Sequence, residues 1–337
     1  MACGPDCPVC GRAIFCTGGS GSFGRAFAAE LLTHHEPARV TLYSRGEHAQ
    51  IEAARALSDL PMGKRLRMRI GDARDRDRLR VAMDGHEVVV HGAALKVLAS
   101  GLADPDEMVK TNVMGTLAVL GAAWETGVQR VLTISSDKAC APINLYGQTK
   151  ALAEGLTVGW NVFGFPRGTW YAAVRWGNCL GSRGSVVHAF RRMLRAGEPI
   201  RITDPRMTRF WITLDEAVAF ALLALRSMRG GEVFLPHLPA TTVMDVAKAV
   251  AAVEGRAAPF ECVFAGAIPG EKVHEDLLAE GEAPRAVDVD AFVVLEPAHL
   301  SLPRAPWLGA PAKPMRSDAA PALGFDRLRD MIAAVPG

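Results

Sequence analysis

The sequence lacks the features that would place the protein in a membrane, outside the cell or on nucleic acid. Its 337 residues contain no apolar run near the roughly 18 residues that a membrane span requires. The first residues, MACGPDCPVCGRA, lack the apolar segment of a signal peptide. Lysine plus arginine number 38 and aspartate plus glutamate 36, and this near balance argues against nucleic-acid binding through bulk basicity. We therefore expect a cytoplasmic globular protein that binds neither a membrane nor nucleic acid.

Cysteine is sparse and unevenly placed. There are seven, an odd number that does not suit a secreted disulfide framework. Cys3, Cys7 and Cys10 are spaced C-x3-C-x2-C, a pattern that can hold zinc or an iron–sulfur cluster as thiolates. A fourth ligand is missing, because Cys16 lies in an apolar run that we expect to be a buried strand. We predict no metal site and keep these three cysteines as a secondary hypothesis, the alternative being a mobile extension with incidental thiols.

Short apolar runs alternate with longer helical patterns over the first 175 residues. Strands are predicted at residues 12–17, 39–43, 66–70, 87–91, 131–135 and 170–174, and helices at 25–32, 51–57 and 113–124. This alternation predicts right-handed βαβ units and an α/β fold with a Rossmann-like, doubly wound parallel sheet. In such folds, ligands bind beyond the carboxyl ends of the strands.

A glycine-rich loop follows the first predicted strand. The segment TGGSGSFG has the pattern G-x-x-G-x-x-G, in which glycine permits a tight turn and lets backbone N–H groups approach a pyrophosphate. The helix that follows directs its N-terminal dipole at the phosphates. A glycine string alone is weak, but its place between a strand and a helix indicates a dinucleotide site. The residues predicted to bind the cofactor here are Gly18, Ser20, Gly21, Ser22, Phe23 and Gly24.

The second predicted strand ends in TLYSRG, where sites specific for NAD usually carry an acidic residue. Ser44 and Arg45 stand there instead, a hydroxyl and a guanidinium that suit a 2′-phosphate, so we predict NADP. The alternative is an exposed arginine at a strand end. Asp72, after the third strand, can accept a hydrogen bond from the adenine amine or cap a helix. Ala73 and Ala93 complete this part of the predicted cofactor site.

The chain divides into four predicted segments. Residues 1–11 form a Cys-rich extension, and residues 12–176 an NADP-binding Rossmann domain. After residue 176, helices at 187–196, 214–229 and 243–253 are separated by glycine, proline and short β-like pieces, which predicts a smaller, irregular substrate lobe at 177–300 with the chain crossing between lobes. Five prolines between residues 303 and 321 exclude a long helix there, so residues 301–337 are predicted to be a Pro-rich tail.

Reactive side chains gather after the fifth predicted strand. Tyr146 and Lys150 form Y-x-x-x-K in a chain with only three tyrosines, and on a helix this spacing places both on one face. A nearby ammonium would stabilise the phenolate and lower the pKa of the tyrosine. Ser136, Asp137 and Lys138 stand at the carboxyl end of the strand. Two opposite charges at such a position indicate chemistry, the alternative being a structural ion pair.

Four longer strings carry more information than the glycine loop: SSDKA with PINLYGQTK, RWGNCLGSRGSVV, ITDPRMTRFWITLDEA and PGEKVHEDL. Together with the two motifs above, they resemble the extended short-chain dehydrogenase/reductase superfamily and, within it, the inverting UDP-N-acetylglucosamine 4,6-dehydratases of surface-glycan biosynthesis. The resemblance covers roughly residues 13 to 280, and MTRFWITLDE is its most discriminating part.

The resemblance implies a mechanism without net redox change. Tyr146 takes the proton of the sugar 4-hydroxyl while hydride passes from C4 to tightly bound NADP+, and Lys150 keeps Tyr146 ionised and binds the nicotinamide ribose. Ser136 hydrogen-bonds the 4-oxygen. Lys138, as a neutral amine, removes the C5 proton, and Asp137 protonates the departing 6-hydroxyl. The hydride returns to C6, and C5 is reprotonated from the opposite face. Retaining relatives carry Asp-Glu at these two positions, so an amine base here requires a lowered Lys138 pKa.

The resemblance also implies a UDP-sugar substrate, UDP-N-acetylglucosamine, and a homo-oligomer, either a dimer or a hexamer. The predicted substrate contacts are Lys96, Asn178, Arg183, Arg209, Glu271 and His274. An amide and guanidinium groups suit phosphate oxygens, while Glu271 and His274 are expected to reach the uridine ribose or close the lobe. A structural salt bridge is the alternative reading of each.

Two other functions remain open at this point. A nucleotide-sugar 4-epimerase, or an enzyme that both dehydrates and epimerises, would share Tyr146 and Lys150 without needing Asp137 and Lys138 as acid and base. A non-catalytic NADP-binding regulatory protein would typically lose the tyrosine or the lysine, and both are present.

Overall fold

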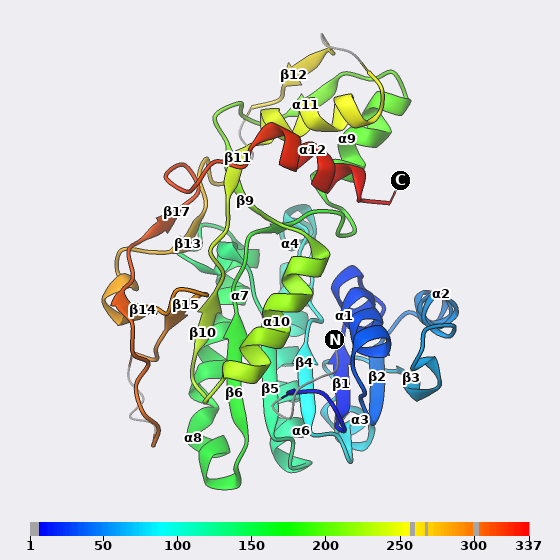
Figure 1. The fold of residues 1–337 in the computed structure, drawn as a ribbon, viewed down its shortest axis with the longest axis vertical. Helices are drawn as coiled ribbons and strands as arrows, with labels where there is room; N and C mark the ends of the chain where they lie inside the picture. Colours follow the sequence, from blue (N-terminus) through cyan, green and yellow to red (C-terminus); the bar gives the residue numbers. More distant parts are fainter. Residues whose placement is uncertain (1–6, 257–259, 267–268, 299–302, 337) are drawn as a thin grey trace.

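A computed structural model describes residues 7–256, 260–266, 269–298 and 303–336 (Figure 1). Its centre is a parallel sheet in the order β3-β2-β1-β4-β5-β6-β10. The strands are β1 (Ala13–Thr17), β2 (Arg39–Ser44), β3 (Leu66–Ile70), β4 (Val88–His91), β5 (Arg130–Ile134), β6 (Trp170–Val174) and β10 (Val233–Leu235). Strands β1 and β4 are buried at every residue, as expected of apolar strands covered on both faces. The predicted Rossmann-like α/β fold is confirmed.

Helices cover both faces of this sheet. One face packs against α1 (Ser22–His34) and α10 (Leu214–Ser227), and the other against α3 (Arg76–Met83) and α6 (Gly115–Glu125). The remaining helices of this part are α2 (Glu47–Leu57), α4 (Leu98–Ala103), α5 (Pro105–Val109), α7 (Leu145–Gly159) and α8 (Asn161–Gly164). A π-helical turn, Lys110–Met114, joins α5 to α6, and single 3-10 turns occupy Gly63–Arg65, Asp137–Ala139, Phe165–Arg167 and Ala283–Arg285.

The chain returns to the sheet after leaving it at residue 176. Beyond β10, three antiparallel strands extend the same sheet in the order β15, β14, β16. They are β14 (Ala286–Asp288), β15 (Val293–Leu295) and β16 (Ala310–Pro311). The sheet edge is therefore built partly from the segments that the sequence assigns to the substrate lobe and the tail.

A second lobe lies beyond one end of the sheet (Figure 1). Its helices are α9 (Val186–Arg195), α11 (Val243–Val253) and α12 (Phe325–Ala333), which enclose a separate apolar core. Its strands are β7 (Asn178–Cys179), β8 (Ile200–Ile202), β9 (Thr208–Ile212), β11 (Ala240–Thr242) and β12 (Cys262–Phe264). The antiparallel pair β13 (Asp276–Leu278) and β17 (Met315–Arg316) packs against the core of the main sheet. Helix α12 follows the Pro-rich stretch and packs against α11. None of the helices in the described ranges is both long and apolar enough to cross a membrane.

Candidate active site

A cleft of about 900 Å³ opens at the carboxyl ends of the parallel strands, and residues 176–186 of the second lobe form its opposite wall. The loops after β1, β2, β4 and β5 converge there, as the sheet topology requires. Every residue predicted to bind the cofactor lines this cleft: Gly18, Ser20, Gly21, Ser22, Phe23, Gly24, Ser44, Arg45, Asp72, Ala73, Ala93, Tyr146 and Lys150.

The glycine-rich loop has the geometry of a pyrophosphate cradle. Gly18 has a φ of 68°, and a Cβ there would lie 2.8 Å from the carbonyl carbon of Gly92. A Cβ at Gly24 would lie 2.7 Å from the Cα of Gly19, so neither position accepts a side chain without a backbone shift. Helix α1 begins at this loop with Gly21 as its N-cap and no capping side chain, which leaves its first N–H groups for a ligand. These residues fit a dinucleotide.

Asp72 and Arg45 line the part of the cleft after β2 and β3, and two arginines lie near the Asp72 carboxylate. The Asp72 carboxylate is held by Arg74, with Nη2 to Oδ2 at 2.7 Å, and Arg45 lies 3.8 Å from the same oxygen. Burial raises the Asp72 pKa, but the hydrogen bonds and charge of Arg74 outweigh this and lower it. The N-cap of α3 is Asp75, so Asp72 does not have the capping role considered as its alternative. The Arg45 side chain is 54% exposed and lines the cleft.

Tyr146 and Lys150 are both buried on α7, at 8% and 6% exposure. Asn144 caps this helix by accepting the N–H of Gly147, and Gly147 lets the helix approach Lys138, whose carbonyl oxygen would lie 2.3 Å from a Cβ. Lys150 Nζ donates to the carbonyl of Ile134 at 2.6 Å. Burial lowers the pKa of Lys150 to about 8, against the opposing charge of Glu154.

The expected lowering of the Tyr146 pKa is wrong for this structure. Burial raises that pKa, and the Lys138 ammonium and a hydrogen bond with Ser136 offset the rise only in part. The reason is that the phenol loses its contact with water, which costs the phenolate more than the charge of Lys138 restores.

Asp137 and Lys138 lie in the 3-10 turn that follows β5, beside Tyr146. Lys138 Nζ donates to Asp137 Oδ1 at 2.8 Å, and the same oxygen accepts from Ser136 Oγ at 2.9 Å. Lys138 and Ser136 line the cleft. Asp137 does not: it is 0% exposed and lies behind them, and its Oδ2 has no partner among the described residues.

Glu275 is a member of this cluster that sequence reasoning missed. It is 2% exposed, its Oε1 lies 3.4 Å from Lys138 Nζ and 3.8 Å from Arg209 Nε, and no described group pairs with its Oε2. Burial raises its pKa, and the charge of Asp137 adds to the rise while the charge of Lys138 opposes it. Its only sequence signal is its place in PGEKVHEDL, beside the two residues chosen there.

The lowered Lys138 pKa that an amine base requires is not found. Burial by itself would lower it, but the carboxylates of Asp137 and Glu275 outweigh the burial and raise the pKa of Lys138 above its usual value. The resting side chain is therefore an ammonium, because two buried carboxylates face it and the guanidinium of Arg209 opposes them only weakly.

Three predicted substrate residues line a smaller cavity of about 140 Å³ next to the cleft, which shares Lys138 with it. Asn178 accepts from Lys138 Nζ through its amide oxygen at 2.9 Å. Arg209 is 5% exposed and donates to the carbonyls of Thr208, Val273 and Lys272, so most of its N–H groups are already used. Glu271 lies 3.5 Å from Arg209, and its Oε2 is buried with no described partner.

The other three predicted substrate residues, Arg183, Lys96 and His274, lie outside this smaller cavity. Arg183 spans the cleft and donates to the carbonyl of Ser20, which places it on the glycine-rich loop. Lys96 lies in the cleft wall with its Nζ 3.3 Å from Ser182 Oγ. His274 lines neither cavity and pairs through Nδ1 with Thr208 Oγ1 at 2.8 Å. Five of the six predicted substrate residues therefore line the two adjoining cavities, which Asn178 connects, and only His274 lines neither.

The sequence is similar to known proteins of nucleotide-sugar metabolism. The model of a family described as "Polysaccharide biosynthesis protein" matches residues 14–297. A UDP-N-acetylglucosamine 4,6-dehydratase (inverting) of Campylobacter jejuni is 36% identical over 86% of this chain and 84% of its own. A UDP-glucose 4-epimerase of Rickettsia prowazekii is 34% identical over 83% of this chain and 82% of its own. The resemblance inferred from the motifs is confirmed.

Solved structures share the fold. The structure of Pen from Bacillus thuringiensis has a TM-score of 0.87 at 30% identity and covers 96% of this chain and 98% of its own. A dTDP-glucose 4,6-dehydratase from Streptomyces venezuelae, solved with NAD, has a TM-score of 0.68 at 23% identity and covers 77% of this chain and 86% of its own. At that identity, the second likeness concerns the fold alone.

Proposed function

This chain belongs to the family of polysaccharide biosynthesis proteins, and from that premise we propose that it is a nucleotide-sugar 4,6-dehydratase. The proposed substrate is UDP-N-acetylglucosamine, the sugar named for the Campylobacter relative, and the product is its 4-keto-6-deoxy form with inversion at C5. The class is a hydro-lyase with a nicotinamide dinucleotide that is regenerated in each turnover.

One observation carries the proposal: an amine and two carboxylates lie together beside the tyrosine. An epimerase needs a group that moves the 4-hydroxyl proton, which Tyr146 and Lys150 supply. Removal of water across C5 and C6 also needs a base and an acid at neighbouring carbons. Asp137, Lys138 and Glu275 are the groups available for that second task. The epimerase therefore fits the site less well, although epimerases occur among the relatives.

Tyr146 is the proposed base for the 4-hydroxyl proton. In the structure, Lys138 and Ser136 are the groups that favour the phenolate, and we propose that Lys150, which has a pKa of about 8 and remains mostly charged at neutral pH, adds to their effect. Ser136, which hydrogen-bonds Asp137 and lines the cleft, is positioned to hold the sugar 4-oxygen. A nicotinamide held in the cleft beside Tyr146 and Lys150 would supply the hydride acceptor for C4 and the hydride donor for C6.

Lys138 becomes a base if its proton moves to Asp137. The two atoms are 2.8 Å apart, and one proton transferred from Nζ to Oδ1 converts the ammonium–carboxylate pair into an amine and a carboxylic acid. Those are the two forms that the elimination requires. The amine of Lys138 takes the C5 proton, and the proton now on Asp137 is delivered to the departing 6-hydroxyl, which leaves as water. Burial by itself penalises both charges, but the carboxylates of Asp137 and Glu275 outweigh it in the resting structure, so the neutral pair is proposed to form only during turnover. We propose that Asp137 acts through Lys138 and Ser136, since it does not itself reach the cleft.

Glu275 is proposed to position Lys138 and to stabilise its ammonium form between turnovers. Its carboxylate oxygen Oε1 lies 3.4 Å from Lys138 Nζ, and both residues line the small cavity that joins the cleft. Arg209 balances the second negative charge, so the charges of the partly exposed Lys138 and the three buried groups sum to zero. We place the sugar at this junction, next to Asn178.

The preferred cofactor is NADP. The support is the absence of a carboxylate at the end of β2, where Ser44 and Arg45 stand, and the engagement of Asp72 by Arg74. Arg183, which touches the glycine-rich loop, is proposed to bind the cofactor pyrophosphate rather than the substrate.

The decisive experiment follows the reaction in D2O by NMR with purified protein, NADP+ and UDP-N-acetylglucosamine. We expect a 4-keto-6-deoxy sugar with deuterium at C5 and the opposite C5 configuration. A product that keeps its 6-hydroxyl and changes only at C4 identifies an epimerase and refutes the proposal.

The matched variants are Lys138→Met and the exposed Lys248→Met on α11. The first should stop at the 4-keto stage with reduced cofactor accumulating, seen as its near-ultraviolet absorbance, while the second should turn over normally. Full dehydration by Lys138→Met would remove Lys138 from the mechanism.

A further inference from the structure

The N-terminal cysteines lie in a packed segment against the end of α1. Val9 is 0% exposed, and the N–H of Gly11 donates to the carbonyl of Glu36 at 2.8 Å. From Cys7 onward, the segment is therefore part of the domain and not the mobile extension considered from the sequence. Cys3 lies outside the described residues.

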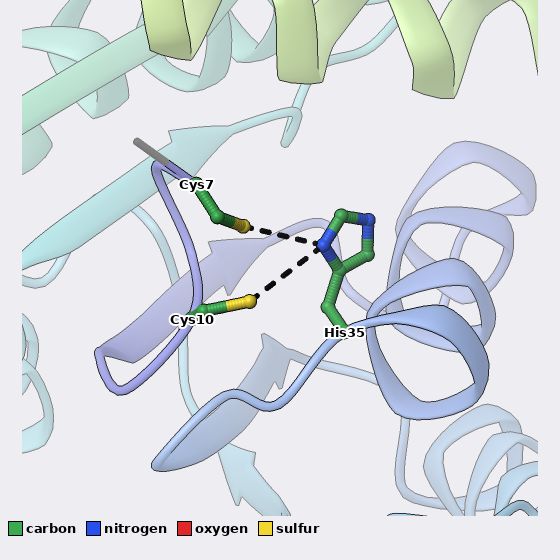
Figure 2. Close-up of side chains that lie close together, drawn as sticks. All are labelled: Cys7, Cys10 and His35. Carbon is green, nitrogen blue, oxygen red and sulfur yellow. Dashed lines mark hydrogen bonds between the residues drawn. The ribbon is translucent and has the colours of Figure 1, made fainter. Parts of the chain in front are cut away.

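Cys7 and Cys10 point at His35, the residue that ends α1 (Figure 2). Cys7 Sγ lies 3.3 Å and Cys10 Sγ 4.0 Å from His35 Nδ1, and all three atoms lie within 4.8 Å of one another. In a tetrahedral zinc site with Zn–S near 2.3 Å and Zn–N near 2.0 Å, a sulfur and a nitrogen ligand are about 3.5 Å apart. The two sulfur–nitrogen distances lie on either side of that value.

The other nitrogen of His35 lies near a carboxylate. Its Nε2 is 3.6 Å from Glu30 Oε1, five residues earlier in the chain, which is ion-pair distance and slightly longer than a hydrogen bond. Ligand histidines commonly direct their second nitrogen at a carboxylate, which fixes the ring and strengthens the ligand. The backbone supports the arrangement from the other side, since Gly11, with a φ of 68°, turns the chain directly after Cys10.

The donor set selects the metal. Two thiolates and an imidazole suit zinc, whereas magnesium and calcium prefer oxygen ligands. Both sulfurs are free thiols in the structure, so neither is consumed by a disulfide. Two thiolates also neutralise the charge of a divalent ion in a half-buried position.

We propose that Cys7, Cys10 and His35 bind one Zn²⁺ that fastens the N-terminal segment to the end of α1. The fourth position of the tetrahedron is open to water or to a further thiolate. The ion would be structural, because the 13 residues of α1, at 1.5 Å each, separate His35 from the glycine-rich loop by about 20 Å. The zinc would thus anchor the far end of the helix whose other end faces the cofactor.

The test measures metal in protein purified without chelator and without a histidine tag. Wild type should hold close to one zinc per chain by elemental analysis, whereas Cys7→Ser, Cys10→Ser and His35→Ala should hold less than about a tenth of that. Cys262→Ser, a half-buried cysteine in β12, is the control and should keep its zinc. Glu30→Gln should bind zinc about tenfold more weakly, as losing a carboxylate partner of a ligand histidine typically does.

A second readout does not depend on the variants folding. Cobalt added to metal-free wild type should give the thiolate-to-cobalt absorption of a tetrahedral site, and zinc should displace it. Removal of zinc by chelator should lower the thermal midpoint, and zinc should restore it. Metal-free wild type that takes up no zinc, a Cys7–Cys10 disulfide in its place, or full zinc in the Cys7 and Cys10 variants would each overturn the proposal.

Discussion

Lys150 should destabilise the cofactor-free protein because its charge is buried. Its pKa falls from 10.5 to about 8 in the folded chain. At 1.36 kcal/mol per pKa unit, this difference amounts to about 3 kcal/mol. The folded state disfavours the ammonium, so the penalty is complete below pH 8 and disappears as the pH rises through the unfolded pKa. We therefore predict that wild type loses stability, relative to a variant without this charge, as the pH falls from about 10 to 7.

The variant for this prediction is Lys150→Met, which keeps the length of the side chain. It also loses the hydrogen bond to the Ile134 carbonyl, worth about 1.5 to 3 kcal/mol for a charged donor, so its stability at a single pH is not diagnostic. The difference between variant and wild type is diagnostic, because contributions from other groups cancel. That difference should move in favour of the variant by about 2 to 3 kcal/mol between pH 10 and pH 7.

Urea unfolding of the cofactor-free proteins, at fixed protein concentration and several pH values, measures this difference. Lys248→Met, at an exposed position on α11, controls for the general effect of losing a lysine. If the stability difference between Lys150→Met and wild type is the same at pH 7 and pH 10, the buried-charge reasoning is wrong. Agreement would mean that Lys150, the proposed catalytic lysine, is kept at a cost in stability, as is common at active sites.

Three more predictions concern the cleft. Gly18→Ala should weaken cofactor binding more than tenfold in a titration, because the new Cβ would collide with the backbone of Gly92. Gly127→Ala is the control: Gly127 has a similar φ but open space around it, so this variant should lose only about 1 kcal/mol of stability and bind the cofactor normally. Arg45→Ala should raise the KM for NADP+ about tenfold or more and leave that for NAD+ nearly unchanged, since one charge-assisted contact is removed. Glu275→Gln should lower the pKa of Lys138, because one of the two carboxylates near its ammonium is removed. The dehydration rate of the variant should therefore rise with pH in a range where the wild-type rate is flat. If the pH–rate profiles of the two proteins superimpose, the proposed role of this contact is wrong.

The buried cluster explains why the acid and base must be considered as a unit. Lys138 forms ion pairs with Asp137 and Glu275, and Glu275 also lies near Arg209. Removing any one member leaves a buried charge without compensation, which typically costs about 3 to 5 kcal/mol. Glu275→Gln also removes one charge, but it keeps the size of the side chain and leaves no cavity, so its effect reports the charge more directly than a truncation would.

Local features of the chain were predictable from residue order. The bounds of β3 and β6 coincide with the predicted 66–70 and 170–174, and α11 with 243–253. The glycine-rich loop also lies where its motif places it, and it lines the cleft. The end of the Pro-rich tail was less predictable: the amphipathic helix α12 follows the prolines and gains its stability by packing on α11.

By itself, the sequence determined the alternation of strands and helices, the glycine loop and the pairing of Tyr146 with Lys150. These depend on periodicity and backbone freedom, which are properties of consecutive residues. Only the tertiary structure decided that Glu275 faces Lys138, that Arg209 is occupied by carbonyls, and that His35 completes the cysteine cluster. Such contacts join segments far apart in the chain, and whether two side chains meet is set by packing and burial, as are the pKa values that follow.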